Sequence, residues 1–220
     1  MAHTFAEMDV ETYIVREPRR LGGAAKERIL AFIEEAQNVN CEKGLKQLFH
    51  GRVNELIPHQ IAAFGIGDRG KLWMRSTINI GFPESYLRNV IIDNRVIVSP
   101  VIKAWAENPV VQIFNDLMPM KKQNPRWGEV VEHHGIRNMI VHGLPDIGGE
   151  NSSYFCLAKC PGPITEEQGY LMELITPHLH KALLCAINTK ATGHQSEHRL
   201  TAREHEVLRA MCRGYANKEI

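Results

Sequence analysis

Segments with the features of β-strands constrain the fold of this chain most. They occur at five places, residues 60–67, 72–80, 110–117, 137–144 and 152–159. The first two flank a turn-like cluster at 68–71, in which Gly70 tolerates the positive φ that many tight turns need. The last two flank a loop at 145–151. We therefore expect two hairpins and one further strand in an antiparallel sheet.

Helical segments precede, interrupt and follow these strands. Helices are expected at 24–39, at 42–57, over much of 83–108 and at 127–134. Apolar residues recur at helical spacing in the first two segments, and Pro58 ends the second because proline cannot continue a helix. Pro100 interrupts the third segment.

A long helix is expected at 165–188. Thr165 and Gln168 form a capping box, in which the hydroxyl and the amide each bond a backbone N–H that would otherwise be unpaired. Pro177 lies inside this helix and is expected to kink it, because it lacks an N–H and crowds the carbonyl four residues earlier. The whole pattern predicts an α+β domain, with an antiparallel sheet of about five strands flanked by helices, an α/β/α arrangement like that of GAF and PAS sensors.

The composition is that of an ordinary globular protein, with 44% hydrophobic and 23% charged residues. A formal net charge of +1 argues against a chain that coats nucleic acid, but it allows a local DNA-binding patch. No apolar run approaches the roughly 20 residues of a membrane span, and residues 1–20 lack the apolar stretch of a secretory signal. We expect a cytoplasmic protein that does not contact membranes.

The five cysteines suit a reducing compartment rather than a disulfide framework. Cys156 and Cys160 lie in an expected strand, about 13 Å apart at its rise per residue, whereas a disulfide needs Cα atoms within about 7 Å. We expect a structural role for both. The chain shows no nucleophile paired with a base, no phosphate-binding loop and no pair of carboxylates. We therefore predict that the chain is not an enzyme and that it binds no cofactor or metal.

The tail at 200–220 has the pattern of a helix, a turn and the start of a second helix. Thr201 and Glu204 form a capping box, Gly214 suits the left-handed conformation that ends a helix, and Asn217 is a good N-cap. This order is typical of a helix-turn-helix. The polar stretch before the tail is the expected linker, so the chain divides into a domain at 1–188, a linker at 189–199 and the tail.

The sequence of this tail resembles the opening of the LuxR-type DNA-binding domain. The matching residues are Leu200, Thr201, Arg203, Glu204, Glu206, Val207, Leu208, Gly214, Asn217, Lys218, Glu219 and Ile220. The resemblance implies a DNA-binding transcription regulator, in which Asn217 and Lys218 contact phosphates at a helix N-terminus. It also implies a homodimer, because such modules bind two half-sites. The helix that reads bases does not follow, and we expect a truncation.

The first domain resembles the acyl-homoserine-lactone-binding domain that precedes this module in LuxR-type regulators. The resemblance rests on Phe82-Pro83-x-x-Tyr86, Ser99-Pro100-Val101 and Gly135-Ile136-Arg137-Asn138-Met139. It implies a pocket for a small-molecule effector, with Tyr86, Val90, Ser99 and Met139 as its candidate residues. One of the three tryptophans can serve as a lid, and Trp73 is our candidate. Residues 140–143 with 152–155 resemble a subgroup associated with exopolysaccharide and exosortase loci.

The departures from that family fall on the candidate residues. Tyr86, Val90, Ser99 and Met139 stand where the family has Trp, Tyr, Asp and Gly. A neutral hydroxyl in place of a carboxylate and a larger side chain in place of glycine argue against ordinary lactone binding. Each of these residues also suits a plain core position.

Two functions remain open from the sequence. The chain is either a DNA-binding regulator whose first domain senses a small molecule or mediates dimerisation, or a sensor fold that serves only as a protein-interaction or dimerisation module without a ligand. A third interpretation, an enzyme with an incidental tail, is weaker. A buried pocket large enough for a ligand would separate the first function from the second.

Overall fold

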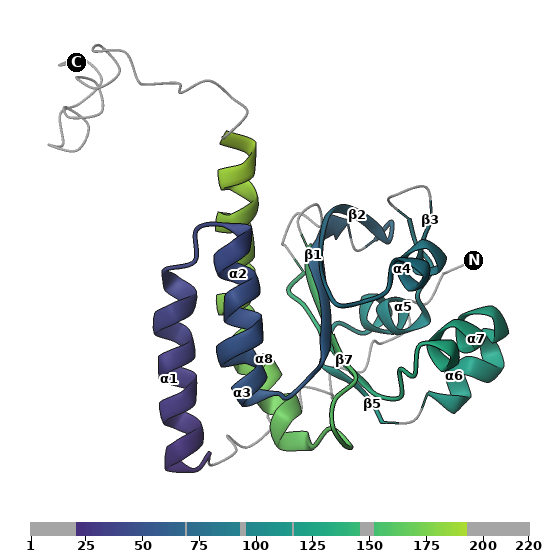
Figure 1. Ribbon diagram of the computed structural model, residues 1–220, viewed down its shortest axis with the longest axis horizontal. Helices are drawn as coiled ribbons and strands as arrows, with labels where there is room; N and C mark the ends of the chain where they lie inside the picture. Colours follow the sequence, from purple (N-terminus) through teal and green to yellow (C-terminus); the bar gives the residue numbers. More distant parts are fainter. Residues whose placement is uncertain (1–20, 69, 93–95, 116, 146–151, 193–220) are drawn as a thin grey trace, which may run out of the picture.

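The computed structural model describes residues 21–68, 70–92, 96–115, 117–145 and 152–192 (Figure 1). Its centre is a seven-stranded antiparallel sheet in the order β3-β4-β2-β1-β7-β6-β5. The strands are β1 (Ile61–Asp68), β2 (Trp73–Ile80), β3 (Ile91–Ile92), β4 (Val96–Ile97), β5 (Gln112–Phe114), β6 (Met139–His142) and β7 (Ser152–Ala158). Both predicted hairpins are present, as β1–β2 and β6–β7.

The sheet has two strands more than the sequence predicted. Both β3 and β4 are only two residues long and lie in the segment expected to be mainly helical. Among the described residues, one pair, Trp73 with Val96, joins this small hairpin to β2. Two-residue strands are too short to show an alternating apolar pattern, so periodicity could not detect them.

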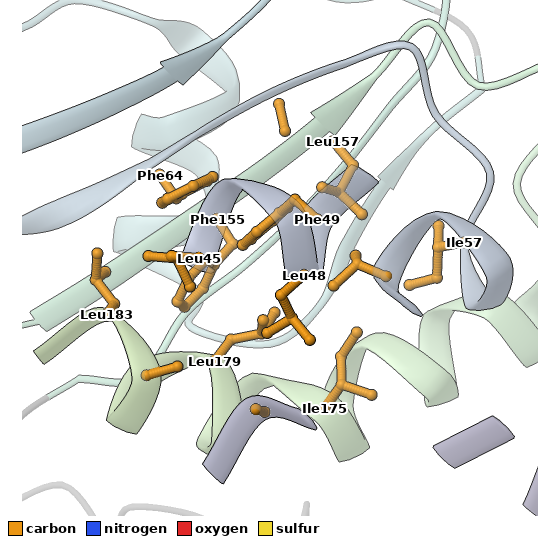
Figure 2. Close-up of a cluster of buried hydrophobic side chains, with 14 of the residues drawn as sticks. Leu45, Leu48, Phe49, Ile57, Phe64, Phe155, Leu157, Ile175, Leu179 and Leu183 are labelled. Carbon is orange, nitrogen blue, oxygen red and sulfur yellow. The ribbon is translucent and has the colours of Figure 1, made fainter. Parts of the chain in front are cut away.

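One face of the sheet is covered by α1 (Gly23–Gln37), a continuous helical run of α2 (Glu42–Leu48), a π-helical turn (Phe49–Val53) and α3 (Asn54–Leu56), and by α8 (Glu166–Thr192) (Figure 1). Alternate sheet residues such as Phe64, Phe155 and Leu157 point into this layer and are fully buried. The Phe49 ring stacks on Phe64 with 4.1 Å between centroids (Figure 2). This large cluster is the main core of the domain.

The other face is covered by four shorter helices, α4 (Glu84–Val90), α5 (Pro100–Glu107), α6 (Met118–Gln123) and α7 (Pro125–His133) (Figure 1). The intervening positions of β7, Tyr154, Cys156 and Ala158, are buried on this side. All seven residues of β7 are therefore buried. The α+β fold with helices on both faces of an antiparallel sheet is the predicted class.

The long helix α8 begins with the predicted capping box and continues to Thr192, four residues beyond the predicted end. Pro177 lies inside it, on an exposed position. None of the helices described is both long enough and apolar enough to cross a membrane. Cys156 lies in β7 and is buried, whereas Cys160 lies two residues beyond the end of β7, outside the strand expected to contain both, and is partly buried. Both are free thiols. The tail, including Asn217 and Lys218, lies outside the described residues.

Candidate functional site

A small cavity lies between the sheet and helices α4 and α5. Its volume is about 40 Å³. The sheet contributes Ala63, Met74, Thr77, Tyr154 and Cys156 to its wall, and the helical side contributes Tyr86, Leu87, Val90, Ser99, Val101 and Ile102. None of the described side chains in this wall carries a formal charge at neutral pH. The cavity is therefore an apolar space with a few neutral polar groups at its edge.

Small residues on β1 leave room on this side of the sheet. Ala63, Gly65 and Gly67 alternate with Ala62, Phe64 and Ile66, which face the main core. A register shift between Ile66 and Gly67 adds one residue to β2. Such a bulge reverses the direction of the following side chains.

Met74 is the residue that the bulge directs into this space. Its methyl group occupies the space that a Cβ on Gly65 would need. A side chain at Gly65 would therefore collide with Met74 and with the backbone of β2. Glycine at this position lets the flexible thioether chain lie flat over β1 and form part of the cavity wall.

Ser99 is the N-cap residue of α5, but its hydroxyl does not cap the helix. The residue is 2% exposed, and its Oγ has no hydrogen-bond partner among the described residues. A buried hydroxyl without a partner is rare in proteins and costs about 1–3 kcal/mol. Ser99 therefore presents an unused donor and acceptor to the cavity.

The titratable groups around the cavity are held neutral by burial. Burial raises the pKa of Tyr86, and the nearby Trp127 indole N–H offsets only a small part of this effect. Burial also raises the pKa of Tyr154 well above its usual value, and that of Cys156 to about 12. A thiol with such a pKa is a poor nucleophile, because the thiolate is the reactive form. The polar groups around the cavity can therefore form hydrogen bonds with a ligand while they remain uncharged.

The structure brings three of the five predicted ligand-binding residues together. Tyr86, Val90 and Ser99 all line the cavity, although they are up to 13 residues apart in the chain. Met139 is fully buried on the same face of the sheet but is not among the lining residues. A methionine in place of the family's glycine was expected to crowd the pocket, but the Met139 side chain does not line this cavity.

The fifth predicted residue, Trp73, lies beside a neighbouring cavity. This second cavity measures about 20 Å³, and its wall includes Trp73, Trp105 and Ser152. Trp73 is 39% exposed, so it stands at the protein surface.

Sequence reasoning missed the lining residues that the strands contribute. Tyr154 and Cys156 alternate with Phe155 along β7, and their place on the cavity side follows from that alternation once the strand's register is known. The position of Met74 depends on the bulge, which no sequence pattern indicated.

Comparison with solved structures shows a shared fold at low sequence identity. The described domain is similar to the N-acylhomoserine lactone-dependent LuxR family transcription factor CepR2 from Burkholderia cenocepacia, with 12% identity, a TM-score of 0.56, and coverage of 77% of this chain and 98% of that one. It is similar to SdiA in complex with octanoyl-rac-glycerol, with 14% identity, a TM-score of 0.53, and coverage of 91% and 82%.

A GAF domain from a phosphoenolpyruvate-protein phosphotransferase of Coxiella burnetii is also similar, with 18% identity, a TM-score of 0.51, and coverage of 76% of this chain and 98% of that one. No family model and no curated protein matches the chain. The likeness therefore shows the fold, which is that of LuxR-type autoinducer-binding domains and GAF domains.

Proposed function

We propose that this chain is a transcription regulator of the LuxR type whose first domain binds an uncharged small molecule. The observation that carries this proposal is the buried Ser99 hydroxyl, which borders an apolar cavity and has no partner within the described part of the chain. An apolar cavity with a few polar groups at its edge is the usual form of a small-molecule site. Two proteins of similar fold are described as lactone-dependent and as bound to octanoyl-rac-glycerol, which supports a ligand of this kind.

Mass spectrometry of compounds that co-purify with the protein tests this proposal. The protein is isolated without denaturation, the bound fraction is extracted, and the extract is compared with that of a Ser99→Phe variant. Phenylalanine would fill the cavity, because Ser99 lines it and the ring would extend into a space of only about 40 Å³. A compound present with the wild type and absent from the variant supports the proposal. Identical extracts, from two proteins that unfold cooperatively, contradict it.

A second function is favoured by the size of the cavity. Ligand sites usually measure about 300–1,000 Å³, so 40 Å³ is too small for a drug-sized molecule without movement of its walls. In this alternative the domain serves only for dimerisation or protein interaction, and the sensor fold binds nothing. Co-purification of no compound, together with a stable dimer, would favour the alternative.

The DNA-binding role is supported by the tail sequence alone. Asn217 and Lys218 would contact phosphates, as the resemblance to LuxR-type modules implies. The experiment is a mobility-shift assay on a chain that continues through a recognition helix, with an Asn217→Ala, Lys218→Ala double variant. We expect weaker binding and a smaller salt dependence in the variant. Unchanged binding would contradict the assigned role.

A homodimer is part of the same proposal. Regulators that bind two half-sites match the two-fold symmetry of their operators. Light scattering at micromolar concentration measures the mass directly. A monomer would contradict the dimer, whether or not a ligand is bound.

A further inference from the structure

The two cavities on the helix α5 side of the sheet share a wall. Met74, Ile97, Ile102 and Tyr154 line both the 40 Å³ cavity and the 20 Å³ cavity. Met74 has three rotatable side-chain bonds and adapts its shape readily. A movement of its side chain away from the shared wall would join the two spaces into one channel.

The first cavity also shares part of its wall with a depression of about 250 Å³ in the protein surface. Met74, Thr77, Leu87 and Ile91 line both the depression and the cavity. These four side chains therefore border both spaces. The same flexible residue, Met74, lines all three spaces, so a rotation of its side chain would change the walls of all three at once.

The far end of this channel carries two further buried polar atoms without partners in the described structure. Trp105 is 2% exposed and Ser152 is 4% exposed, and neither Trp105 Nε1 nor Ser152 Oγ has a hydrogen-bond partner among the residues described. Both residues line the second cavity. The Trp105 ring packs edge-on against Tyr154, with 5.9 Å between centroids, which holds the indole in place.

Ser99 lines the first cavity and Trp105 lines the second, and the two residues lie near opposite ends of helix α5. They are six residues apart, which corresponds to about 9 Å along a helix axis. Unpartnered polar atoms at both ends of an apolar space are costly in the free protein, and a ligand that bonds to them removes that cost.

We propose that the two cavities are the halves of one binding site, and that its ligand is an uncharged aliphatic molecule with an oxygen group at each end. This inference rests on the ligand-binding function proposed above and names the chemical class. The indole N–H can only donate, so the group at the Trp105 end must be an acceptor, such as a carbonyl, ether or hydroxyl oxygen. The Ser99 and Ser152 hydroxyls can donate or accept.

The charges around the channel favour a neutral ligand. The described wall of the first cavity has no charged side chain. Among the described residues of the second cavity, Asp68 alone is charged, and its carboxylate is paired with Lys71 at 3.2 Å. Arg75 and Arg88 line the surface depression, but no cation is among the described residues that line the two cavities. A carboxylate inside either cavity would therefore lose its hydration without a cationic partner, which is strongly unfavourable.

Calorimetry with three probes of equal chain length tests the two-ended site. The probes are octanediol with a hydroxyl at each end, octanol with one hydroxyl, and octanoate. We expect the wild-type protein to bind the diol about tenfold more tightly than octanol, because the second hydroxyl gains a buried hydrogen bond. Octanoate should bind more weakly than either alcohol.

The matched variants are Trp105→Phe and Trp127→Phe. Both replace a buried indole in the same hydrophobic cluster, but Trp127 lines neither cavity. Trp105→Phe should lower the diol affinity about tenfold and leave octanol within about twofold, whereas Trp127→Phe should leave the ratio between the two alcohols unchanged. If Trp105→Phe does not fold, Ser152→Ala provides a smaller change at the same end and should also reduce the preference for the diol.

The outcomes separate this inference from the function on which it rests. Equal binding of diol and octanol, or a preference that survives Trp105→Phe, overturns the two-ended site but leaves ligand binding in place. If none of the probes binds, this inference is wrong, and a co-purifying compound of different chemistry would still sustain the proposed function.

Discussion

Thr165 and Gln168 each satisfy a backbone N–H of the other at the start of α8. The Gln168 N–H donates to the Thr165 hydroxyl at 3.2 Å, and the Thr165 N–H donates to the Gln168 side-chain carbonyl at 2.9 Å. Because α8 packs against α1 and α2 in the main core, its first turn fixes the position of a long element.

Loss of this cap should destabilise the domain. Thr165→Ala removes the hydroxyl and should lower the free energy of unfolding by about 1 kcal/mol, the usual cost of losing an N-cap. Thr165→Ser keeps the hydroxyl and should be close to the wild type. Urea unfolding measures both. Equal midpoints for the alanine and serine variants would contradict a contribution from the cap.

The capping box illustrates what the sequence could predict. Thr165 and Gln168 are three residues apart, so their interaction depends only on local geometry. The hairpins β1–β2 and β6–β7 were predictable for the same reason, because each joins neighbouring segments of chain. The shared position of Tyr86 and Ser99 at the cavity wall was predicted only through resemblance to a family.

The rest depends on features that single residues do not reveal. The bulge beside Gly67 decides that Met74 faces the cavity, and a shift of one residue would point it to the opposite face. The sequence did not predict helix α6, because this helix has only six residues and no buried side chain. All six residues are described. The size of a cavity depends on how side chains from several elements pack, which no local pattern encodes.

In the ligand-free protein, the Ser99 hydroxyl should lower the free energy of unfolding. Ser99→Ala removes a buried hydroxyl that does not cap α5 and has no partner among the described residues, so the free energy of unfolding should rise by about 1 kcal/mol. Ser153→Ala is the matched control, because the Ser153 Oγ is also buried but accepts a hydrogen bond from the Leu144 N–H at 3.3 Å. The control should be destabilised by about 1 kcal/mol. Urea unfolding in the absence of ligand measures both, and a loss of stability in Ser99→Ala would refute the assignment.

His142 should make the protein less stable in mild acid. Burial lowers its pKa to about 4, and a weaker backbone hydrogen bond with Val110 offsets this in part. Between about pH 6.5 and pH 4 the unfolded chain binds a proton that the folded chain does not, so stability falls as the pH falls through this window. The loss across the whole window is on the order of 3 kcal/mol, because a tenfold difference in proton affinity corresponds to about 1.4 kcal/mol.

Urea unfolding at pH 7 and pH 5 measures the contribution of His142. His142→Gln should reduce the loss of stability between the two pH values, because the variant has one fewer group to protonate on unfolding. His133→Gln is the control, since His133 is exposed on α7. His59, whose pKa burial also lowers, remains in both variants and leaves a residual dependence. The same pH dependence in His142→Gln and the wild type would show that this histidine is not responsible.

Acyl-homoserine lactones should not bind this domain with submicromolar affinity. Their amide N–H needs an acceptor, and Ser99 offers a neutral hydroxyl, which bonds about half as strongly as a carboxylate. The 40 Å³ cavity must also expand before it admits a lactone ring and an acyl chain. Calorimetry with lactones of short to long acyl chain measures the affinity directly. Submicromolar binding by any of them would show that the neutral hydroxyl suffices.

Replacing Ser99 by aspartate should raise the affinity of the site for acyl-homoserine lactones. Ser99→Asp places a charged acceptor at the cavity wall, and a charge-assisted hydrogen bond to the amide N–H should raise lactone affinity about tenfold. The free variant should be less stable than the wild type, because its buried carboxylate has no partner until the ligand arrives. Met139→Ala is the control: it should lose about 2–5 kcal/mol of stability as a core truncation and gain no lactone affinity, since Met139 does not line the cavity. Tighter lactone binding by Met139→Ala than by Ser99→Asp would place the ring end of the site beside β6 instead of at the start of α5.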